Sequence, residues 1–310
     1  MNLILTSKCN NKCSFCFAKN TLKNHQELTS EDVQIIAAYH TKNEPIKLLG
    51  GEPTLSPHFA DILKVLKTVD NPVVLISNFL FKEEIRTVIE DFTVSKKLSA
   101  LINISETDFH CLGEIKKNII DGLKNDFSLA FTLNPSFNFI TYRERLECFK
   151  KDFNYFSVRV SLPFPNPKKV KDFYMYKDYR YAELLVKFIK WCVISEIKIS
   201  LDCGLFPCMM KDEHQENFIR QHLGDFKYGC LGVPADIINK NEIQYCYPAE
   251  FIKINIEKHI NTDSMTNELR LKGKELQSLG ELPLQCISCE HLHQKCPGPC
   301  LGFIKNQGEK

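Results

Sequence analysis

Short apolar runs and longer amphipathic segments alternate along the first two thirds of the chain. The apolar runs have the length of strands, and the segments between them carry apolar residues at helical spacing. One helix is expected after Thr29, with Asp32 completing its cap, and another from Pro57, capped by Ser56. The predicted strands are residues 2–6, 46–49, 73–77, 100–104, 128–133, 156–162 and 197–201. The other predicted helices are residues 83–91, 113–124, 142–151 and 181–195.

Strands that alternate with helices of about ten residues predict an α/β chain, with a parallel sheet curled into a partial or full barrel. Three prolines within residues 163–167 interrupt the pattern, because proline fits neither a helix interior nor a central strand. We therefore expect a domain boundary in this region or soon after it, and we draw it at residue 200. Residues 1–200 would form the barrel, and residues 201–310 a small cysteine-rich domain.

Charge and composition argue against several classes of partner. The 310 residues include 40 basic and 38 acidic ones, and the net charge of +2 indicates neither a nucleic acid nor an anionic membrane as partner. No apolar run approaches the roughly 18 to 20 residues of a membrane span, and no signal peptide is recognisable. The 14 cysteines therefore indicate metal or redox chemistry in the cytoplasm and not a disulfide framework.

Three of the cysteines, Cys9, Cys13 and Cys16, lie close together directly after the first predicted strand. Their loop leaves the C-terminal end of that strand, where barrel enzymes place their reactive groups. Three thiolates can hold three irons of a four-iron cluster, and one iron stays open because a closed cluster takes four cysteines. The alternatives that the spacing leaves open are a zinc-binding loop and chance clustering.

The C-x3-C-x2-C spacing, with the aromatic Phe15 before the last cysteine, resembles the signature of the radical S-adenosylmethionine (SAM) superfamily. The resemblance implies a partial (β/α)6 TIM-like barrel, in which the amino and carboxylate groups of SAM chelate the open iron. Gly50, Gly51, Glu52 and Pro53 follow the second predicted strand and match the family's G-G-E-P turn, which binds the methionine amino group of SAM. Two glycines there let the backbone approach a ligand closely.

Other positions resemble weaker features of the family. Ser77 and Asn78 end the third predicted strand, where relatives often carry T-N-G, although Phe79 replaces the glycine. Ser105 ends the fourth strand, where a polar side chain often reaches the ribose or carboxylate of SAM. Arg159 lies on the sixth strand, where a basic or polar residue often meets the same groups. The alternative for each is a polar residue that satisfies its own loop.

A second group of eight cysteines lies near the C-terminus, enough ligands for two four-iron clusters. Its last four members resemble the SPASM extension of peptide-modifying radical SAM enzymes, although the final cysteine of that pattern is missing. By analogy, a first auxiliary cluster would take Cys208, Cys230, Cys246 and Cys300. A second would take Cys286, Cys289 and Cys296, with Cys203 or Cys208 as a further ligand. The alternatives are a single auxiliary cluster and a zinc site completed by His291 or His293.

The family resemblance also implies a function, the reductive cleavage of SAM to a 5′-deoxyadenosyl radical that takes a hydrogen atom from a substrate. Auxiliary clusters would suit formation of a thioether or carbon–carbon cross-link, or an oxidation, on a side chain of a ribosomally synthesised peptide (RiPP) or a protein. The expected partners are this peptide, a separate leader-binding protein and a flavodoxin- or ferredoxin-type reductant. One alternative is a radical SAM dehydrogenase or maturase acting on a small molecule or on a folded protein such as a sulfatase. The other is a non-catalytic iron–sulfur or zinc protein that transfers electrons or serves as a scaffold.

Overall fold

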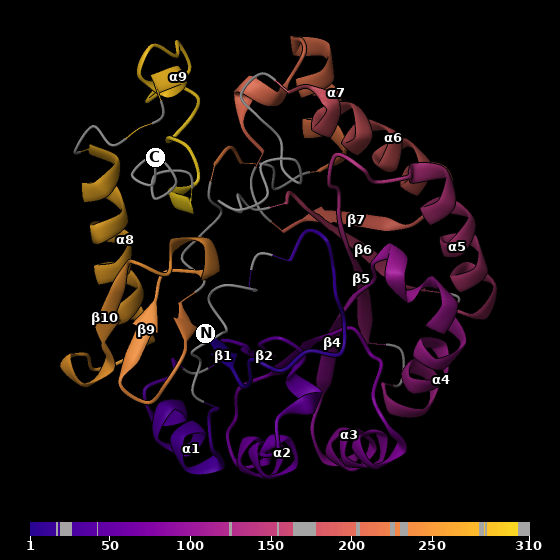
Figure 1. The fold of residues 1–310 in the computed structure, drawn as a ribbon, viewed down its shortest axis with the longest axis vertical. Coiled ribbons are helices and arrows are strands. Elements are labelled where there is room, and N and C mark those ends of the chain that lie inside the picture. Colours follow the sequence, from indigo (N-terminus) through magenta and orange to yellow (C-terminus); the bar gives the residue numbers. More distant parts are fainter. Residues whose placement is uncertain are drawn as a thin grey trace. The chain divides into compact units, whose positions relative to one another are not determined.

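The computed structural model describes residues 1–16, 18, 27–41, 43–123, 126–153, 155–163, 178–202, 205–223, 227–229, 235–278, 282 and 284–302. The chain divides into two compact units, and Figure 1 shows their elements as a ribbon. The first unit comprises residues 1–128 with 233–272, and the second comprises residues 129–232 with 273–310. The domain boundary at residue 200 stays a prediction.

A mostly parallel sheet forms the centre of the first unit. Its first four strands are β1 (Asn2–Ile4), β2 (Ile46–Leu49), β3 (Val73–Ser77) and β4 (Leu98–Asn103). They pair in parallel in this order, and the register places Leu3 beside Leu48 and Leu48 beside Leu75. All three side chains are fully buried, so one apolar row crosses the strands. The sequence predicts these strands to within a few residues, because their apolar runs are distinct.

A second set of strands extends this sheet from the other side of β1. The two-residue strand β8 (Asp236–Ile237) pairs with β1 in parallel, and β9 (Glu242–Gln244) and β10 (Lys253–Asn255) follow in antiparallel order. The sequence predicts none of the three, since strands this short carry almost no alternation. They bring a late segment of the chain beside its first strand.

Helices pack along the parallel strands of the first unit, and Figure 1 shows α1, α2 and α3 next to one another on the outer side of the sheet. The helices are α1 (Ser30–Ala38), α2 (Phe59–Lys67), α3 (Glu83–Ser95) and α4 (Leu112–Gly122), and α8 (Thr262–Ser278) ends in the second unit. In α2 the buried side chains Phe59, Ile62, Leu63 and Leu66 repeat at the spacing of one helix face. Each helix thus buries an apolar stripe.

Two helix starts were predicted in detail, and one of them is wrong. Thr29 caps α1 in a capping box with Asp32, as expected. The helix expected from Pro57 instead begins at Phe59, with His58 at its N-cap. The Ser56 hydroxyl still accepts a hydrogen bond from the His58 amide at 3.2 Å, but it does so in the turn before the helix.

The second unit holds the remaining strands of the repeating pattern, and the chain enters it within β5. The strands are β5 (Phe127–Thr132), β6 (Ser157–Ser161) and β7 (Lys198–Leu201). The helices are α5 (Phe139–Asp152), α6 (Arg180–Ile194), α7 (Glu213–His222) and α9 (Leu284–Ile287). β6 and β7 pair in parallel. Aromatic rings fill the core beside them, with Phe137 stacked on Tyr142 at 3.9 Å between ring centroids.

The predicted α/β class, with helices between parallel strands as in a partial (β/α)6 barrel, is confirmed. Among the helices that the structure describes, none combines the length and the apolar character needed to cross a membrane.

Candidate metal centre

The cysteine loop begins where the ends of β1 and β2 are held together. The amide of Gly51 donates to the carbonyl of Thr6 at 2.8 Å, and the amide of Glu52 donates to that of Lys8 at 2.7 Å. A Cβ atom on Gly50 would lie 2.5 Å from the Thr6 oxygen, and one on Gly51 would lie 2.3 Å from the Lys8 oxygen. Both glycines are therefore required for this backbone approach, which fixes the chain one residue before Cys9.

Glu52 connects the ends of β2 and β3. Its carboxylate is buried and accepts hydrogen bonds from the hydroxyls of Thr54 at 2.7 Å and Ser77 at 2.8 Å. It also accepts from the backbone amides of Thr54 at 3.2 Å and Asn78 at 2.9 Å. Burial raises the pKa of this carboxyl group, and the four donors oppose that shift. Glu52 and Ser77 thus organise the strand ends, and Pro53 begins the 3₁₀ helix Pro53–Leu55.

Asn78 connects the end of β3 to the cysteine loop. Its side-chain amide donates to Oδ1 of Asn10 at 2.7 Å, and Nδ2 of Asn10 donates to the Leu80 carbonyl at 2.7 Å. Phe79 takes a φ of 59° although it is not a glycine, and its side chain is fully buried against Phe81. The backbone therefore keeps the left-handed conformation that the family's glycine would favour.

The end of β4 holds the other side of the loop. Asp108 is buried and accepts from the Ser105 amide and hydroxyl, both at 2.7 Å, in a capping box of the 3₁₀ helix Glu106–Cys111. Its second oxygen accepts from Nδ2 of Asn11 at 2.6 Å. Ser105 also lowers the pKa of the Cys13 thiol, against the larger effect of burial. Ser105 is thus engaged with Asp108 at the side of the loop, and a contact with SAM stays a prediction.

The three thiols of the loop lie close enough to affect one another. Partial burial raises the pKa of Cys9, and it raises the pKa of Cys13 to about 11. The neighbouring thiols act in the same direction, Cys16 on both and Cys9 on Cys13. Because three thiolates here would repel one another, the site favours a cationic group that displaces their protons, and iron is such a group.

The described residues contain no group of three histidine, cysteine, aspartate or glutamate side chains arranged around one metal ion. A four-iron cluster requires a different arrangement, because each cysteine binds its own iron. Cys16 packs against the apolar cluster of Ile4, Ala18 and Tyr247, while Phe15 lies in the turn before it. The loop is thus anchored at both ends, and the donor set fits a cluster.

Sequence reasoning missed the residues that position this loop: Asn10, Asn11, Asp108 and Tyr247. One of them had a signal, because Ser105 and Asp108 have the spacing of a capping box. The others make contacts between distant parts of the chain, and no local sequence pattern predicts such contacts.

A model of the radical SAM superfamily matches residues 3–192 of the chain. The protein belongs to the radical SAM superfamily. A [4Fe–4S] cluster and SAM are the cofactors that this family implies, and the cysteine loop is the part of the described chain whose donor set fits them. A search of curated proteins finds no match.

Several solved structures have a similar fold. Streptococcus suis SuiB bound to S-adenosylmethionine is 17% identical, with 100% of this chain and 74% of SuiB covered and a TM-score of 0.66. SuiB bound to precursor peptide SuiA is 17% identical, covers 100% and 72%, and has a TM-score of 0.69. Native anSMEcpe with bound AdoMet and Cp18Cys peptide is 15% identical, covers 96% and 88%, and has a TM-score of 0.60. At these identities the similarity shows the fold alone.

Arg159 lies on β6 in the second unit and forms an ion pair with Asp202, which follows β7. Both side chains are partly exposed. The guanidinium of Arg159 is thus paired within its own unit, and its contact with SAM stays a prediction.

Six of the eight cysteines in the second group are described, and Cys203 and Cys230 lie outside the described residues. All six are half-buried. They are Cys208, Cys246, Cys286, Cys289, Cys296 and Cys300. The pKa of Cys286 is raised to about 11, first by burial and then by the neighbouring thiols Cys296 and Cys289. Three thiols of the SPASM-like segment therefore lie near one another.

Residues that flank the two undescribed cysteines also come together in the second unit. Leu205 forms a β-bridge with Tyr228, and the Gly229 amide donates to the Leu205 carbonyl at 3.0 Å. A Cβ atom on Gly229 would lie 2.3 Å from Cγ of Pro297, which directly follows Cys296. The chain around residues 205, 229 and 297 thus converges, as a shared metal site would require.

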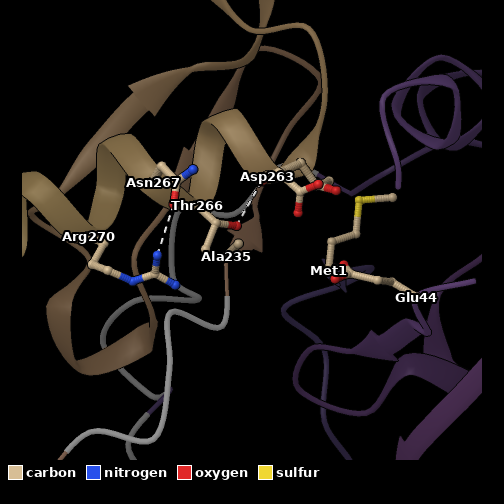
Figure 2. A pocket seen from close by; sticks show the side chains of 8 residues that line it. Met1, Glu44, Ala235, Asp263, Thr266, Asn267 and Arg270 are labelled. Carbon is tan, nitrogen blue, oxygen red and sulfur yellow. Dashed lines mark hydrogen bonds between the residues drawn. The ribbon is translucent and has the colours of Figure 1, made fainter. Parts of the chain in front are cut away.

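A pocket of about 370 Å³ also lies in the first unit, and none of its lining residues is a cysteine. Figure 2 shows Asp263 and Arg270 of α8 on one side of it and Glu44 on the other. Arg270 donates to Asn267 at 2.9 Å. The lining residues include none of the strand-end groups that support the cluster loop, so the candidate site does not depend on this pocket.

Proposed function

We propose that this protein is a radical SAM enzyme that modifies a side chain of a ribosomally synthesised peptide or of a protein. In this proposal Cys9, Cys13 and Cys16 hold the [4Fe–4S] cluster that binds SAM. The observation that carries it is the direct attachment of the G-G-E-P turn to the start of the cysteine loop, through the amides of Gly51 and Glu52. One backbone arrangement thereby supports both the cluster ligands and the turn that is proposed for SAM.

When bound, the cluster and SAM supply one-electron cleavage of a sulfur–carbon bond and a carbon radical that can take a hydrogen atom. The chain holds and orients these groups. Because the amides of Gly51 and Glu52 already donate to Thr6 and Lys8, the proposal assigns the SAM amino group to carbonyl acceptors of the turn. Glu52 accepts four hydrogen bonds from neighbouring strand ends, so we assign it a structural role and not that of a base.

The peptide substrate is supported by the structures of similar fold. SuiB was solved with precursor peptide SuiA, and anSMEcpe with the Cp18Cys peptide. The SPASM-like cysteines add ligands for one or two auxiliary clusters, which would accept an electron from the substrate or bind its thiolate. A thioether, a carbon–carbon cross-link and an oxidation are the products we propose. A cytoplasmic location, a flavodoxin- or ferredoxin-type reductant and a separate leader-binding protein belong to the same proposal.

The first test is the iron and sulfide content after anaerobic reconstitution, for the wild type and a variant with Cys9, Cys13 and Cys16 replaced by alanine. With three all-cysteine clusters we expect about twelve irons falling to about eight, and with one auxiliary cluster about eight falling to about four. About four falling to none would favour a zinc site at the second group of cysteines. If the variant loses no iron, the cluster assignment is wrong.

The second test is formation of 5′-deoxyadenosine from SAM by the reduced protein, followed by mass spectrometry of peptides encoded beside the gene. We expect 5′-deoxyadenosine from the wild type and none from the triple variant. A peptide mass change that requires SAM would support peptide modification. Cleavage of SAM without any peptide product would favour a small molecule or folded protein as substrate, and no cleavage would favour the non-catalytic alternative.

A further inference from the structure

Asp108 places a buried negative charge beside the cysteine loop. Its side chain is only 2% exposed, and its carboxylate accepts three short hydrogen bonds. The donors are the Ser105 amide, the Ser105 hydroxyl and the Asn11 side-chain amide, and all three are neutral. Neutral donors of this kind do not cancel the charge of a carboxylate.

This carboxylate contacts the loop between two proposed cluster ligands. Asn11, its partner at 2.6 Å, lies between Cys9 and Cys13 in the sequence. Ser105, its other partner, lowers the pKa of the Cys13 thiol, against the larger effect of burial. The charge of Asp108 also contributes to the raised pKa of Cys13 and Cys9, where burial is the largest cause; on Cys9 the charges of Glu52 and Cys16 act more strongly than that of Asp108. Asp108 therefore interacts with the loop through both hydrogen bonds and electrostatics.

We propose that Asp108 is a positioning residue of the cluster loop and that its charge lowers the reduction potential of the cluster held there. Reduction adds one electron to the cluster. A fixed negative charge nearby opposes that addition, and net charge and hydrogen bonding are the features that set the potentials of such clusters. The loaded cluster is then a stronger reductant toward its bound cosubstrate. This inference rests on the proposed function, since it requires a cluster at Cys9, Cys13 and Cys16.

The competing explanation is that Asp108 only caps a helix, and α1 offers a matched comparison. Asp32 accepts from the Thr29 amide at 3.1 Å and the Thr29 hydroxyl at 2.9 Å, in a capping box of the same kind. These bonds join Asp32 to Thr29 and not to the cysteine loop. Asp32→Asn therefore weakens a cap in the same unit without removing the charge next to the loop.

The experiment is an anaerobic redox titration of the reconstituted protein. Its readout is the electron paramagnetic resonance signal that changes when SAM is added. The triple cysteine variant identifies this signal by its loss. At the wild-type midpoint potential, we expect Asp108→Asn to raise the ratio of reduced to oxidised cluster about tenfold, a positive shift of about 59 mV for one electron. Asp32→Asn should leave the midpoint unchanged.

If Asp108→Asn does not retain its iron, the exchanged pair Asn11→Asp/Asp108→Asn keeps the test decisive. It restores one carboxylate and one amide across the same contact, so we expect iron retention and a midpoint no higher than that of the wild type. The inference is overturned if Asp108→Asn keeps a SAM-responsive cluster at the wild-type midpoint, or if the exchanged pair has a higher midpoint. If the triple variant loses neither iron nor signal, the proposed function fails, and the inference fails with it.

Discussion

The two cysteine regions of the chain are supported in different ways. The N-terminal loop is held by contacts with other elements of the fold, because β1 and the ends of β2, β3 and β4 each contact it. Asn10 bonds to the residues after β3, Asn11 to Asp108 after β4, and Cys16 packs against Tyr247. A loop fixed at several points is preorganised for its ligand.

The described part of the C-terminal segment forms short turns closed by its own backbone bonds, beside its contacts with Gln277 and Gly229. The Cys289 amide donates to the Cys286 carbonyl at 3.1 Å, and the Cys296 amide to the His291 carbonyl at 2.8 Å. The His293 amide returns to the Cys296 carbonyl at 2.8 Å. Such short turns have little stability alone, so this segment is expected to gain order from metal binding, as small metal domains do. The difference suggests that one site binds its cluster in a preformed loop, while the other folds around its metal.

The largest effect is expected when a glycine in each cysteine region is replaced by alanine, because each replacement should disturb only its own region. Gly51→Ala forces a Cβ to within 2.3 Å of the Lys8 oxygen, and Gly229→Ala forces one to within 2.3 Å of Cγ of Pro297. Each should lower the free energy of unfolding by about 1–3 kcal/mol. We expect Gly51→Ala to lose the SAM-responsive cluster and 5′-deoxyadenosine formation. Gly229→Ala should lose auxiliary iron and retain the SAM-responsive signal.

Gly113→Ala is the control for both variants, because a Cβ on this α4 residue would meet nothing within 4 Å. It should leave the iron content unchanged and stabilise the helix by about 0.5–1 kcal/mol. Loss of the same iron pool in Gly51→Ala and Gly229→Ala would show that the two regions are not supported independently.

The parts of this comparison that the sequence predicts are the local ones. The cysteine spacing and the turn at Gly50 and Gly51 are contiguous, and the strands before them are distinct apolar runs. The contact between Asn11 and Asp108 joins residues 97 positions apart, so only the folded chain brings it about. The same holds for Tyr247 against Cys16, which depends on the two-residue strand β8 reaching β1.

A smaller effect on the cluster is expected from Glu52→Gln, which keeps the size of the side chain but replaces one accepting oxygen with an amide. At least one of the donors at Thr54, Ser77 and Asn78 would then face another donor. We expect a loss of about 2 kcal/mol in urea unfolding, with weaker retention of the SAM-responsive cluster. Thr54→Ala, which removes only one donor, should cost about 1 kcal/mol. Equal losses in the two variants would contradict the role given to Glu52 as the connection between strand ends.

Asp236 makes the stability of the fold around the N-terminal loop depend on pH. Burial raises its pKa from 3.8 to about 7, and its carboxylate accepts from Nδ2 of Asn2 at 2.7 Å, joining β8 to β1. The folded state therefore binds a proton that the unfolded state has already released, and this contribution to stability falls as pH rises from about 4 to about 7. Between pH 6 and 7 the wild type should lose about 1 kcal/mol more than Asp236→Asn, measured by urea unfolding. Parallel pH profiles for the two proteins would contradict it.

The smallest expected effect concerns the histidines between the C-terminal cysteines. If the segment binds iron through thiolates, the double variant His291→Ala/His293→Ala should keep its metal, because the backbone of these residues, and not the imidazole rings, bonds to Cys296. His293 has a φ of 61°, and alanine shares this strain, so the backbone cost should be close to zero. Metal analysis for iron and zinc after reconstitution is the measurement. If zinc is present in the wild type and absent from the double variant, the segment is a tetrahedral zinc site. The two cysteine regions would then differ in the metal they bind as well as in the contacts that hold them.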